Sequence, residues 1–171
     1  MKTLLFSLTL LPILLHTSLI AADSPPKMAV IGEIESLTLE KEKVQFQARI
    51  DTGAQTSSIS AINIQQYERD GKKWVRFEIN GGPDDQAIKM ERPLSRIVQI
   101  KRHGADAVER PVVYLIVSIG NIKCRCEFSL TDRSKYEFPV LIGRNFLSGR
   151  AMVDVSRKHL AHPISKEESK K

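Results

Sequence analysis

The most informative stretch of the sequence is Ala48-Arg49-Ile50-Asp51-Thr52-Gly53-Ala54. It closes a segment, residues 43–50, in which apolar and polar side chains alternate, and such alternation is typical of a half-buried strand. The strand therefore ends in an acid, a hydroxyl residue and a glycine. Asp and Gly also serve ordinary turns, so this stretch alone allows either a catalytic role for Asp51 or a simple turn.

A second informative stretch is Phe138-Pro139-Val140-Leu141-Ile142-Gly143-Arg144-Asn145-Phe146-Leu147. Its apolar residues run directly into Gly, Arg and Asn. The pattern predicts a short buried strand over 139–143 and a short helix that begins near Arg144.

The rest of the chain also reads as strands separated by turns. We expect strands over 74–79, 96–101, 111–119 and 122–130. Asp70-Gly71 is a turn signal and residues 80–85 form a strong break. A second short helix is expected over 60–67. Several short strands between turn residues predict a small barrel or sandwich.

Taken together, the two stretches resemble the retropepsin family of aspartic proteases. More closely, the sequence resembles the bacterial branch of that family that is associated with ATP-grasp glutamate ligases and is often labelled "ATP-dependent zinc protease". The matching segments are 50–58, Asp70-Gly71, 74–77, Thr131-Asp132-Arg133 and 139–144. The resemblance implies an all-β fold, a small closed barrel with one or two short helices.

The resemblance also implies roles for individual residues. Asp51 would be the catalytic carboxylate, Thr52 would bridge two catalytic loops with its hydroxyl, and Gly53 would let these loops approach. The supporting residues would be Ala54, Ile142, Gly143 and Arg144. An aspartic protease needs two carboxylates that share one proton. Because the chain has a single Asp-Thr-Gly, the second Asp51 must come from another copy, in a two-fold homodimer.

Two features depart from the retroviral pattern. Gln55 stands where retroviral enzymes have the Asp that pairs with the Arg of the Gly-Arg-Asn motif. Arg144 then has three alternatives: an internal acid such as Asp132 or Asp154, the Gln55 amide, or a substrate carboxylate in the cleft. The last alternative makes Gln55 and Arg144 weak substrate-binding candidates.

The second departure concerns the flap and the C-terminus. Gly81 and Gly82 are candidates for the tip of a β-hairpin flap, although a plain surface loop explains them equally well. The C-terminal residues 161–171 are polar and include Pro163, so they offer no clear counterpart of the strand that joins retroviral dimers. This leaves constitutive dimerisation open.

The first 22 residues have the layout of a secretory signal peptide. Lys2 is followed by an apolar stretch over 4–15 and by the small residues Ala21 and Ala22. An uncleaved anchor is the alternative, because the cleavage site is imperfect. We expect an exported, periplasmic protein with a linker over 23–28, one domain over 29–160 and a charged tail over 161–171.

Composition narrows the functional classes to which the protein could belong. A chain of 171 residues suits one domain. Lys and Arg number 26 against 20 acids, which suits acidic partners, but no dense basic block predicts nucleic-acid binding. The four histidines lack metal-ligand spacing and no P-loop occurs, so we expect no metal and no cofactor. Cys124 and Cys126 fit half-buried thiols, a strained redox pair or a zinc half-site.

These observations predict an aspartic-type endopeptidase that cleaves peptide or protein substrates, with acidic, glutamate-rich ones favoured by the basic charge. The alternative from another class is a catalytically silent binding module that regulates a membrane or envelope partner. A metal-dependent hydrolase is the weakest alternative. The Asp51–Asp51 dyad distinguishes the peptidase from the silent binding module, because a strict monomer cannot assemble the dyad.

Overall fold

The structure is a computed structural model, and it describes residues 28–80, 87–102 and 105–161. These ranges leave out the predicted signal peptide over 1–22 and the flap glycines Gly81 and Gly82. They also leave out nearly all of the predicted linker over 23–28 and of the C-terminal tail over 161–171.

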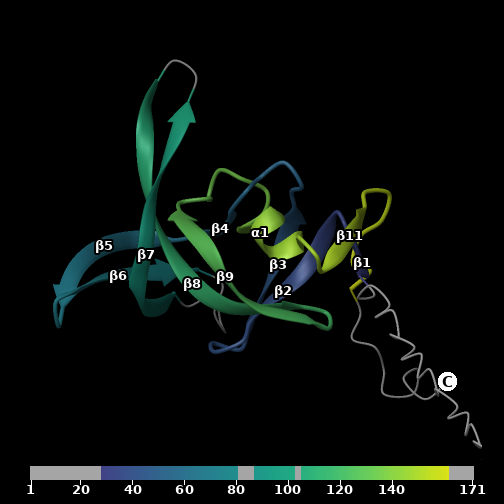
Figure 1. Cartoon of the computed structure of the whole chain (residues 1–171), viewed down its shortest axis with the longest axis horizontal. Coiled ribbons are helices and arrows are strands. Elements are labelled where there is room, and N and C mark those ends of the chain that lie inside the picture. Colours follow the sequence, from purple (N-terminus) through teal and green to yellow (C-terminus); the bar gives the residue numbers. More distant parts are fainter. Residues whose placement is uncertain (1–27, 81–86, 103–104, 162–171) are drawn as a thin grey trace, which may run out of the picture.

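The described chain is built almost entirely of β-strands (Figure 1), which confirms the all-β class. The elements are β1 (Ala29–Gly32), β2 (Ile34–Leu39), β3 (Val44–Ile50), β4 (Ser57–Ser60), β5 (Ile62–Arg69), β6 (Lys72–Ile79), β7 (Ile88–Arg102), β8 (Ala105–Ile119), β9 (Ile122–Thr131), β10 (Val140–Ile142), α1 (Arg144–Leu147) and β11 (Ala151–Asp154).

Six strands close into a small barrel, as predicted. Their order is β2–β3–β10–β4–β9–β8, and β2 also pairs with β8 to complete the ring. The inward side chains fill the interior, which is how a barrel of this size is stabilised. In β3, Val44, Phe46, Ala48 and Ile50 are buried while the residues between them are exposed, because alternate side chains of a strand point to opposite faces.

Strand β8 belongs to the barrel through its C-terminal half, where Val112 to Ile119 pair with β9, and its last residues Val117 to Ile119 also lie opposite β2. Its N-terminal part pairs with β7, and the sheet continues through β6 to β5. Figure 1 shows the β7–β8 hairpin projecting from the barrel, with β5 and β6 across its base. The strands predicted over 96–101 and 111–119 are therefore parts of two 15-residue strands.

The helix predicted over 60–67 is wrong, since this segment ends β4 and begins β5. A β-bulge between Ile62 and Gln65, with Asn63 at a φ of 52°, disrupts the strict alternation of β5. A bulge moves the next apolar side chain out of the two-residue period, so the segment resembles a helical pattern. The helix predicted near Arg144 is present as α1.

Strands β1 and β11 form a separate parallel pair beside the barrel. The chain after β11 folds back over β2, where His159 N donates to the carbonyl of Ile34 at 2.8 Å. Here the buried Glu35 carboxylate accepts hydrogen bonds from the backbone N–H groups of Gly32, Leu160 and Ala161. Among the described residues, no helix has the length and apolar character needed to span a membrane.

The two cysteines are free thiols on β9, with Cys126 buried and Cys124 half-buried. Both side chains face the barrel interior. A hydrogen bond from Cys126 lowers the pKa of Cys124 to about 7. The same hydrogen bond, together with burial, raises the pKa of Cys126. Cys124 is therefore the more acidic thiol of the pair.

Candidate active site

Asp51 begins a loop that joins β3 to β4, and both of these strands pair with β10. Strand β10 is parallel to β3 and antiparallel to β4, so it lies between the two ends of the loop. The Asp51 N–H donates to the Ile142 carbonyl at 2.9 Å, at the end of β10. The two stretches singled out in the sequence are therefore neighbours in space.

The Asp51 carboxylate folds back onto its own loop. Its Oδ1 accepts hydrogen bonds from Gly53 N at 2.8 Å and from Ala54 N at 3.1 Å. A Cβ on Gly53 would lie 3.1 Å from this oxygen, closer than most real contacts. Within the described ranges Oδ2 accepts no hydrogen bond. Asp51 is half-buried and Thr52 and Gly53 are exposed, so one carboxylate oxygen is fixed by the loop and the other is available.

The start of α1 supports the loop from behind. Gly143 approaches so closely that a Cβ there would lie 2.8 Å from the Ala54 carbonyl oxygen. Arg144 N then donates to this oxygen at 2.8 Å, and Asn145 N donates to the Gln55 carbonyl at 3.1 Å. Glycine is required at 143 because any side chain would push the loop away.

Arg144 binds the loop backbone. Its Nη1 donates to the carbonyls of Thr52 at 3.1 Å and Gly53 at 2.7 Å. The predicted acidic partners are engaged elsewhere, Asp132 with Ser134 and Asp154 with Ser156 and Arg157. Of the three alternatives for Arg144, the structure therefore does not show the internal acid, because two backbone carbonyls accept hydrogen bonds from Nη1 at this exposed position.

Sequence reasoning missed the pair formed by Ser57 and Asn145. The Asn145 Oδ1 accepts from Ser57 N and Oγ, while its Nδ2 donates to the Glu127 carbonyl at 2.8 Å. Ser57 Oγ in turn accepts from Gly143 N at 3.0 Å. These bonds join β4, β9 and α1 immediately behind the loop. The Gly-Arg-Asn motif was the available signal, but only its Gly and Arg were assigned roles.

A cleft of about 530 Å³ adjoins the loop. It lies between residues 54–56 and the β7–β8 hairpin, and it is lined by Ala54, Gln55, Thr56, Ser58, Arg96, Val98, Gln99, Ile100, Arg110, Ser129, Arg133, Tyr136 and Leu141. Asp51 itself is not in this lining, but the residues that follow its turn are. The described residues that cover the cleft come from β7 and β8, whereas the flap candidates Gly81 and Gly82 lie outside the described ranges.

Arginines give the cleft a positive character, and no lining residue is acidic. Arg133 is buried, donates to Ser58 Oγ at 2.9 Å and packs against the Tyr136 ring at 4.5 Å. Burial lowers the pKa of Arg133, and the neighbouring Arg110 cation lowers it further, while the Asp51 carboxylate acts in the opposite direction. The Nε of Arg110 is buried and has no hydrogen-bond partner among the described residues. The lining of the cleft therefore includes one cationic side chain with an unused donor.

Arg96 stands at the edge of the same cleft. It donates to Glu127 Oε2 at 2.7 Å and to Thr56 Oγ1 at 3.3 Å. The hydrogen bonds from Arg96 hold the pKa of Glu127 below its usual range. Thr56 and Arg96 thus connect the Asp51 loop to the β7–β8 hairpin.

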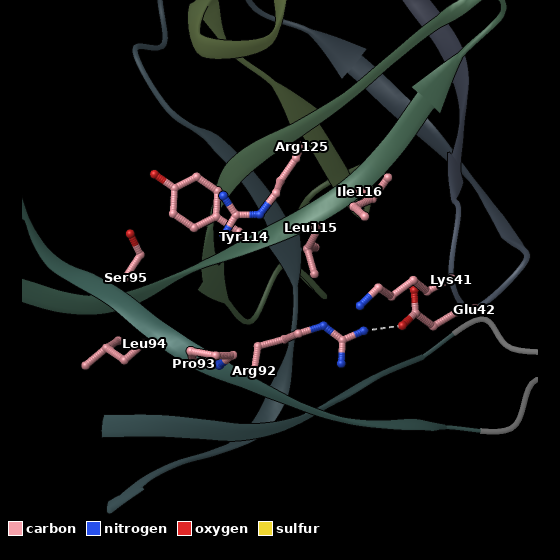
Figure 2. Close-up of a pocket in the computed structure, with 10 residues that line it drawn as sticks. All are labelled: Lys41, Glu42, Arg92, Pro93, Leu94, Ser95, Tyr114, Leu115, Ile116 and Arg125. Atoms are coloured by element: carbon pink, nitrogen blue, oxygen red, sulfur yellow. Dashed lines mark hydrogen bonds and ion pairs between the residues drawn. The ribbon is translucent and has the colours of Figure 1, made fainter. Parts of the chain in front are cut away.

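A second cavity, of about 360 Å³, lies between the β2–β3 turn and strands β7 and β8 (Figure 2). It has one carboxylate in its lining, Glu42, and Arg92 pairs with it. At the other end Figure 2 shows Arg125 against the ring of Tyr114, 3.8 Å from its centre. No predicted site residue lines this cavity. In the part of the chain that the structure describes, no group of three metal-ligating side chains gathers.

The chain is similar to several known proteins. Residues 30–163 match the RimB-like family, whose description is retropepsin-like aspartic endopeptidase RimB. A "probable alpha-L-glutamate ligase" from Desulfotalea psychrophila is 32% identical over 137 residues, which are 74% of this chain and 30% of that protein. A protein of the same name from Shewanella pealeana is 34% identical over 114 residues, 65% of this chain and 25% of that protein.

The chain thus spans between a quarter and a third of these curated relatives. The crystal structure of a protein of unknown function from Legionella pneumophila matches with a TM-score of 0.67 and 26% identity, covering 79% of this chain and 99% of that one. The two chains therefore share the fold over about four fifths of this one.

Proposed function

The chain belongs to the RimB-like family of retropepsin-like aspartic endopeptidases, and from this premise we propose that it cleaves peptide bonds with two Asp51 carboxylates, one from each copy of a homodimer. The observation that carries the proposal is the Asp51 loop. One carboxylate oxygen is fixed by Gly53 and Ala54, the other is available, and the loop stands beside a cleft.

The chemistry follows from bringing two such carboxylates together. Like charges about 3 Å apart cannot both ionise, so the pair keeps one proton. The ionised carboxylate removes a proton from a water, which attacks the peptide carbonyl, and the protonated one donates to the carbonyl oxygen. The tetrahedral intermediate then collapses: its C–N bond breaks, the dyad returns a proton to the leaving nitrogen, and a hydroxyl proton goes back to the dyad. Activity should then show a bell-shaped pH profile that belongs to the pair.

Asp51→Asn tests this mechanism, because the amide keeps the shape but cannot share the proton. Removal of a general base typically reduces the rate by about 10²–10⁴-fold. The measurement is cleavage of a peptide library, with Asp70→Asn as the matched control on an exposed turn of the β5–β6 hairpin. Equal rates for Asp51→Asn and the unchanged chain would refute the dyad.

We further propose that the substrates are acidic, glutamate-rich peptides. Arg96, Arg110 and Arg133 line a cleft in which no described residue is acidic, and the buried Nε of Arg110 has no hydrogen-bond partner in the described part of the chain. The relatives' name, a probable alpha-L-glutamate ligase, also associates this domain with L-glutamate. Arg110→Gln should slow cleavage of acidic peptides about tenfold and leave neutral ones unchanged, whereas an equal loss for both would exclude this role.

A catalytically silent module that regulates a membrane or envelope partner is the second candidate. It is favoured by the single carboxylate that one chain brings to the site. This candidate predicts a monomer that binds peptides without cleaving them. Sedimentation of the chain, together with the cleavage assay, decides between the two functions.

Export to the periplasm is proposed from residues 1–22, whose layout is that of a signal peptide. The test is the N-terminus of the protein recovered from the periplasmic fraction of a bacterial host. A new N-terminus close to Asp23 is expected. A full-length protein in the membrane fraction would instead indicate an uncleaved anchor.

A further inference from the structure

We propose that the cavity of about 360 Å³ between the β2–β3 turn and strands β7 and β8 is a second peptide-binding site, which takes an acidic segment of the substrate away from the scissile bond. We call it the fork cavity, and its lining is the one drawn in Figure 2. The inference deepens the proposed function and rests on it, because it assigns part of the recognition of acidic substrates to a site other than the cleft beside the Asp51 loop.

The fork cavity lies where two neighbouring strands of the sheet separate. Strand β7 pairs with β8 from Leu94 onward, whereas its earlier residues 88–93 pair with β6. Strand β8 pairs with β7 up to Val113 and with β2 only from Val117. Among the described strands, residues 114–116 of β8 therefore have a partner on one side only, which is β9.

An unpaired strand edge is a place where an extended peptide can add as a further strand, because backbone N–H and C=O groups point outward along it. Part of this edge is already used, since the Ile116 carbonyl accepts a hydrogen bond from Glu40 N at 2.9 Å. The open part therefore lies next to Tyr114. It suits a short extended segment of peptide rather than a long strand.

The charges of the lining favour an acidic segment. Lys41, Arg92 and Arg125 contribute three cations, and the single carboxylate, Glu42, pairs with Arg92. Within the described ranges, neither Lys41 nor Arg125 has an ion-pair partner. Two cations of the lining are therefore not compensated by an acid of the described chain. Carboxylates of a bound peptide would compensate them.

The Tyr114 ring orients Arg125 for such a contact. The guanidinium lies over the ring, 3.8 Å from its centre, while the residue as a whole is exposed. Stacking of this kind fixes the plane of a guanidinium and leaves the N–H groups at its edge available, and these can bind a carboxylate in a bidentate manner. Figure 2 shows this pair at one end of the cavity and Lys41 beside Glu42 at the other, with Leu115 between them.

The fork cavity is a close neighbour of the cleft beside the Asp51 loop. The pairing of β7 with β8 is irregular between Leu94 and Arg96. At this point both Ser95 Oγ and Arg96 Nη2 donate to the Glu127 carboxylate, each at 2.7 Å. Ser95 lines the fork cavity and Arg96 lines the cleft, so the two sites meet at consecutive residues of β7. A single extended peptide can therefore reach both sites, which favours a segment of the substrate over an unrelated ligand.

Binding of N-acetylated tetraglutamate to the Asp51→Asn chain, in which the dyad cannot cleave it, tests the site. The backbone amide NMR signals of residues 114–116 should shift, and their titration gives the Kd at this site alone. Arg125→Gln and Lys41→Gln should each weaken binding about tenfold, because each removes one cation from the lining. Lys72→Gln, on the exposed turn of the β5–β6 hairpin, is the matched control and should leave the Kd unchanged. Thermal unfolding shows that each variant folds.

Cleavage of an acidic peptide long enough to reach both sites separates this inference from the proposed function. Arg125→Gln should raise KM and leave kcat unchanged, because the fork cavity holds the substrate away from the reacting atoms. If tetraglutamate binds at 114–116 but no peptide is cleaved, the second site stands and the peptidase fails. If peptides are cleaved while Arg125→Gln and Lys41→Gln change neither Kd nor KM, the second site fails.

Inorganic phosphate distinguishes a peptide site from a general anion site. At equal ionic strength, phosphate should leave the tetraglutamate signals in place, because it cannot pair with the strand edge as a peptide backbone does. Neutral tetraglutamine should not shift the signals of residues 114–116. Displacement of tetraglutamate by phosphate, or equal binding of tetraglutamine, would overturn the assignment of an acidic peptide to the fork cavity.

Discussion

The Asn145 amide oxygen accepts two hydrogen bonds from Ser57, one from the backbone N–H at 3.0 Å and one from the hydroxyl at 2.8 Å, although 88 positions separate the two residues. The amide nitrogen donates at the same time to the Glu127 carbonyl. All the polar atoms of this side chain are thus used to fix the end of the Asp51 loop against β9 and α1. A part-buried network of this kind is costly to interrupt, because each partner that is left behind loses its hydrogen bond.

Asn145→Ala should therefore reduce both stability and activity. Three hydrogen bonds disappear, and each contributes about 1 kcal/mol, so the free energy of unfolding should fall by about 2–3 kcal/mol. Urea unfolding measures this change. Asn121→Ala, in the exposed β8–β9 turn, is the control and should change it by less than about 0.5 kcal/mol. If Asn145→Ala lowers the free energy of unfolding no more than Asn121→Ala does, the network does not hold the loop.

Glu35 is a buried carboxylate with a structural role. It accepts hydrogen bonds from backbone N–H groups of Gly32, Leu160 and Ala161, and so ties the end of the domain to β2. Glu35→Gln should destabilise the fold by about 1–3 kcal/mol, because an amide offers one acceptor oxygen and turns its NH₂ group toward other donors. Hydrogen exchange at Leu160 and Ala161 should accelerate. Unchanged exchange there would contradict the role.

Alternation in strands such as β3 predicted a small barrel or sandwich, and the resemblance of the two stretches to a known family favoured the barrel. Hydrogen bonds between residues that are far apart in the sequence could not be predicted. No local sequence pattern indicates that Arg144 donates to two carbonyls of the Asp51 loop, or that Ser57 is hydrogen-bonded to Asn145. The helix predicted over 60–67 failed for a related reason, since the bulge after Ile62 is invisible in a two-residue period.

The sequence also did not predict the charged cleft or the exposed apolar side chains of β1 and β11. Arg110 and Arg133 belong to different strands and loops, and only the closed barrel brings them to one cleft. Met152 reads as an ordinary core residue, because its neighbours Ala151 and Val153 do pack inward. Val30 and Met152 lie opposite each other in the β1–β11 pair, and both are exposed.

The Cys124 thiol should react near neutral pH. Its pKa is lowered to about 7 mainly by the hydrogen bond from Cys126, so about half of it is thiolate at that pH. Alkylation by iodoacetamide should reach half its limiting rate near pH 7. In Cys126→Ala the donor is lost, and the midpoint should move up toward the ordinary value of about 8.5. An unchanged midpoint would show that Cys126 does not stabilise the thiolate. The chain in urea gives the ordinary value for comparison.

The ion pair between Arg96 and Glu127 predicts a specific acid sensitivity. Hydrogen bonds from Arg96 lower the pKa of Glu127 from its usual 4.5 in the folded chain. A carboxyl with a lowered folded pKa stabilises the fold above its unfolded pKa, and this contribution is lost as the pH falls through the folded value. Because Arg96 is 44% exposed, water weakens the pair, and we expect about 1 kcal/mol or less at neutral pH.

Arg96→Gln should accordingly lower stability above about pH 4.5 and leave it unchanged in strong acid, where Glu127 is protonated in both proteins. Unfolding in urea across the pH range from 2 to 7 measures the difference. An NMR titration supplies the control within one sample. The pKa of Glu127 should rise toward 4.5 in the variant, while that of Glu91 stays low because its partner is Arg76. If the titration of Glu127 does not move, Arg96 is not what lowers its pKa.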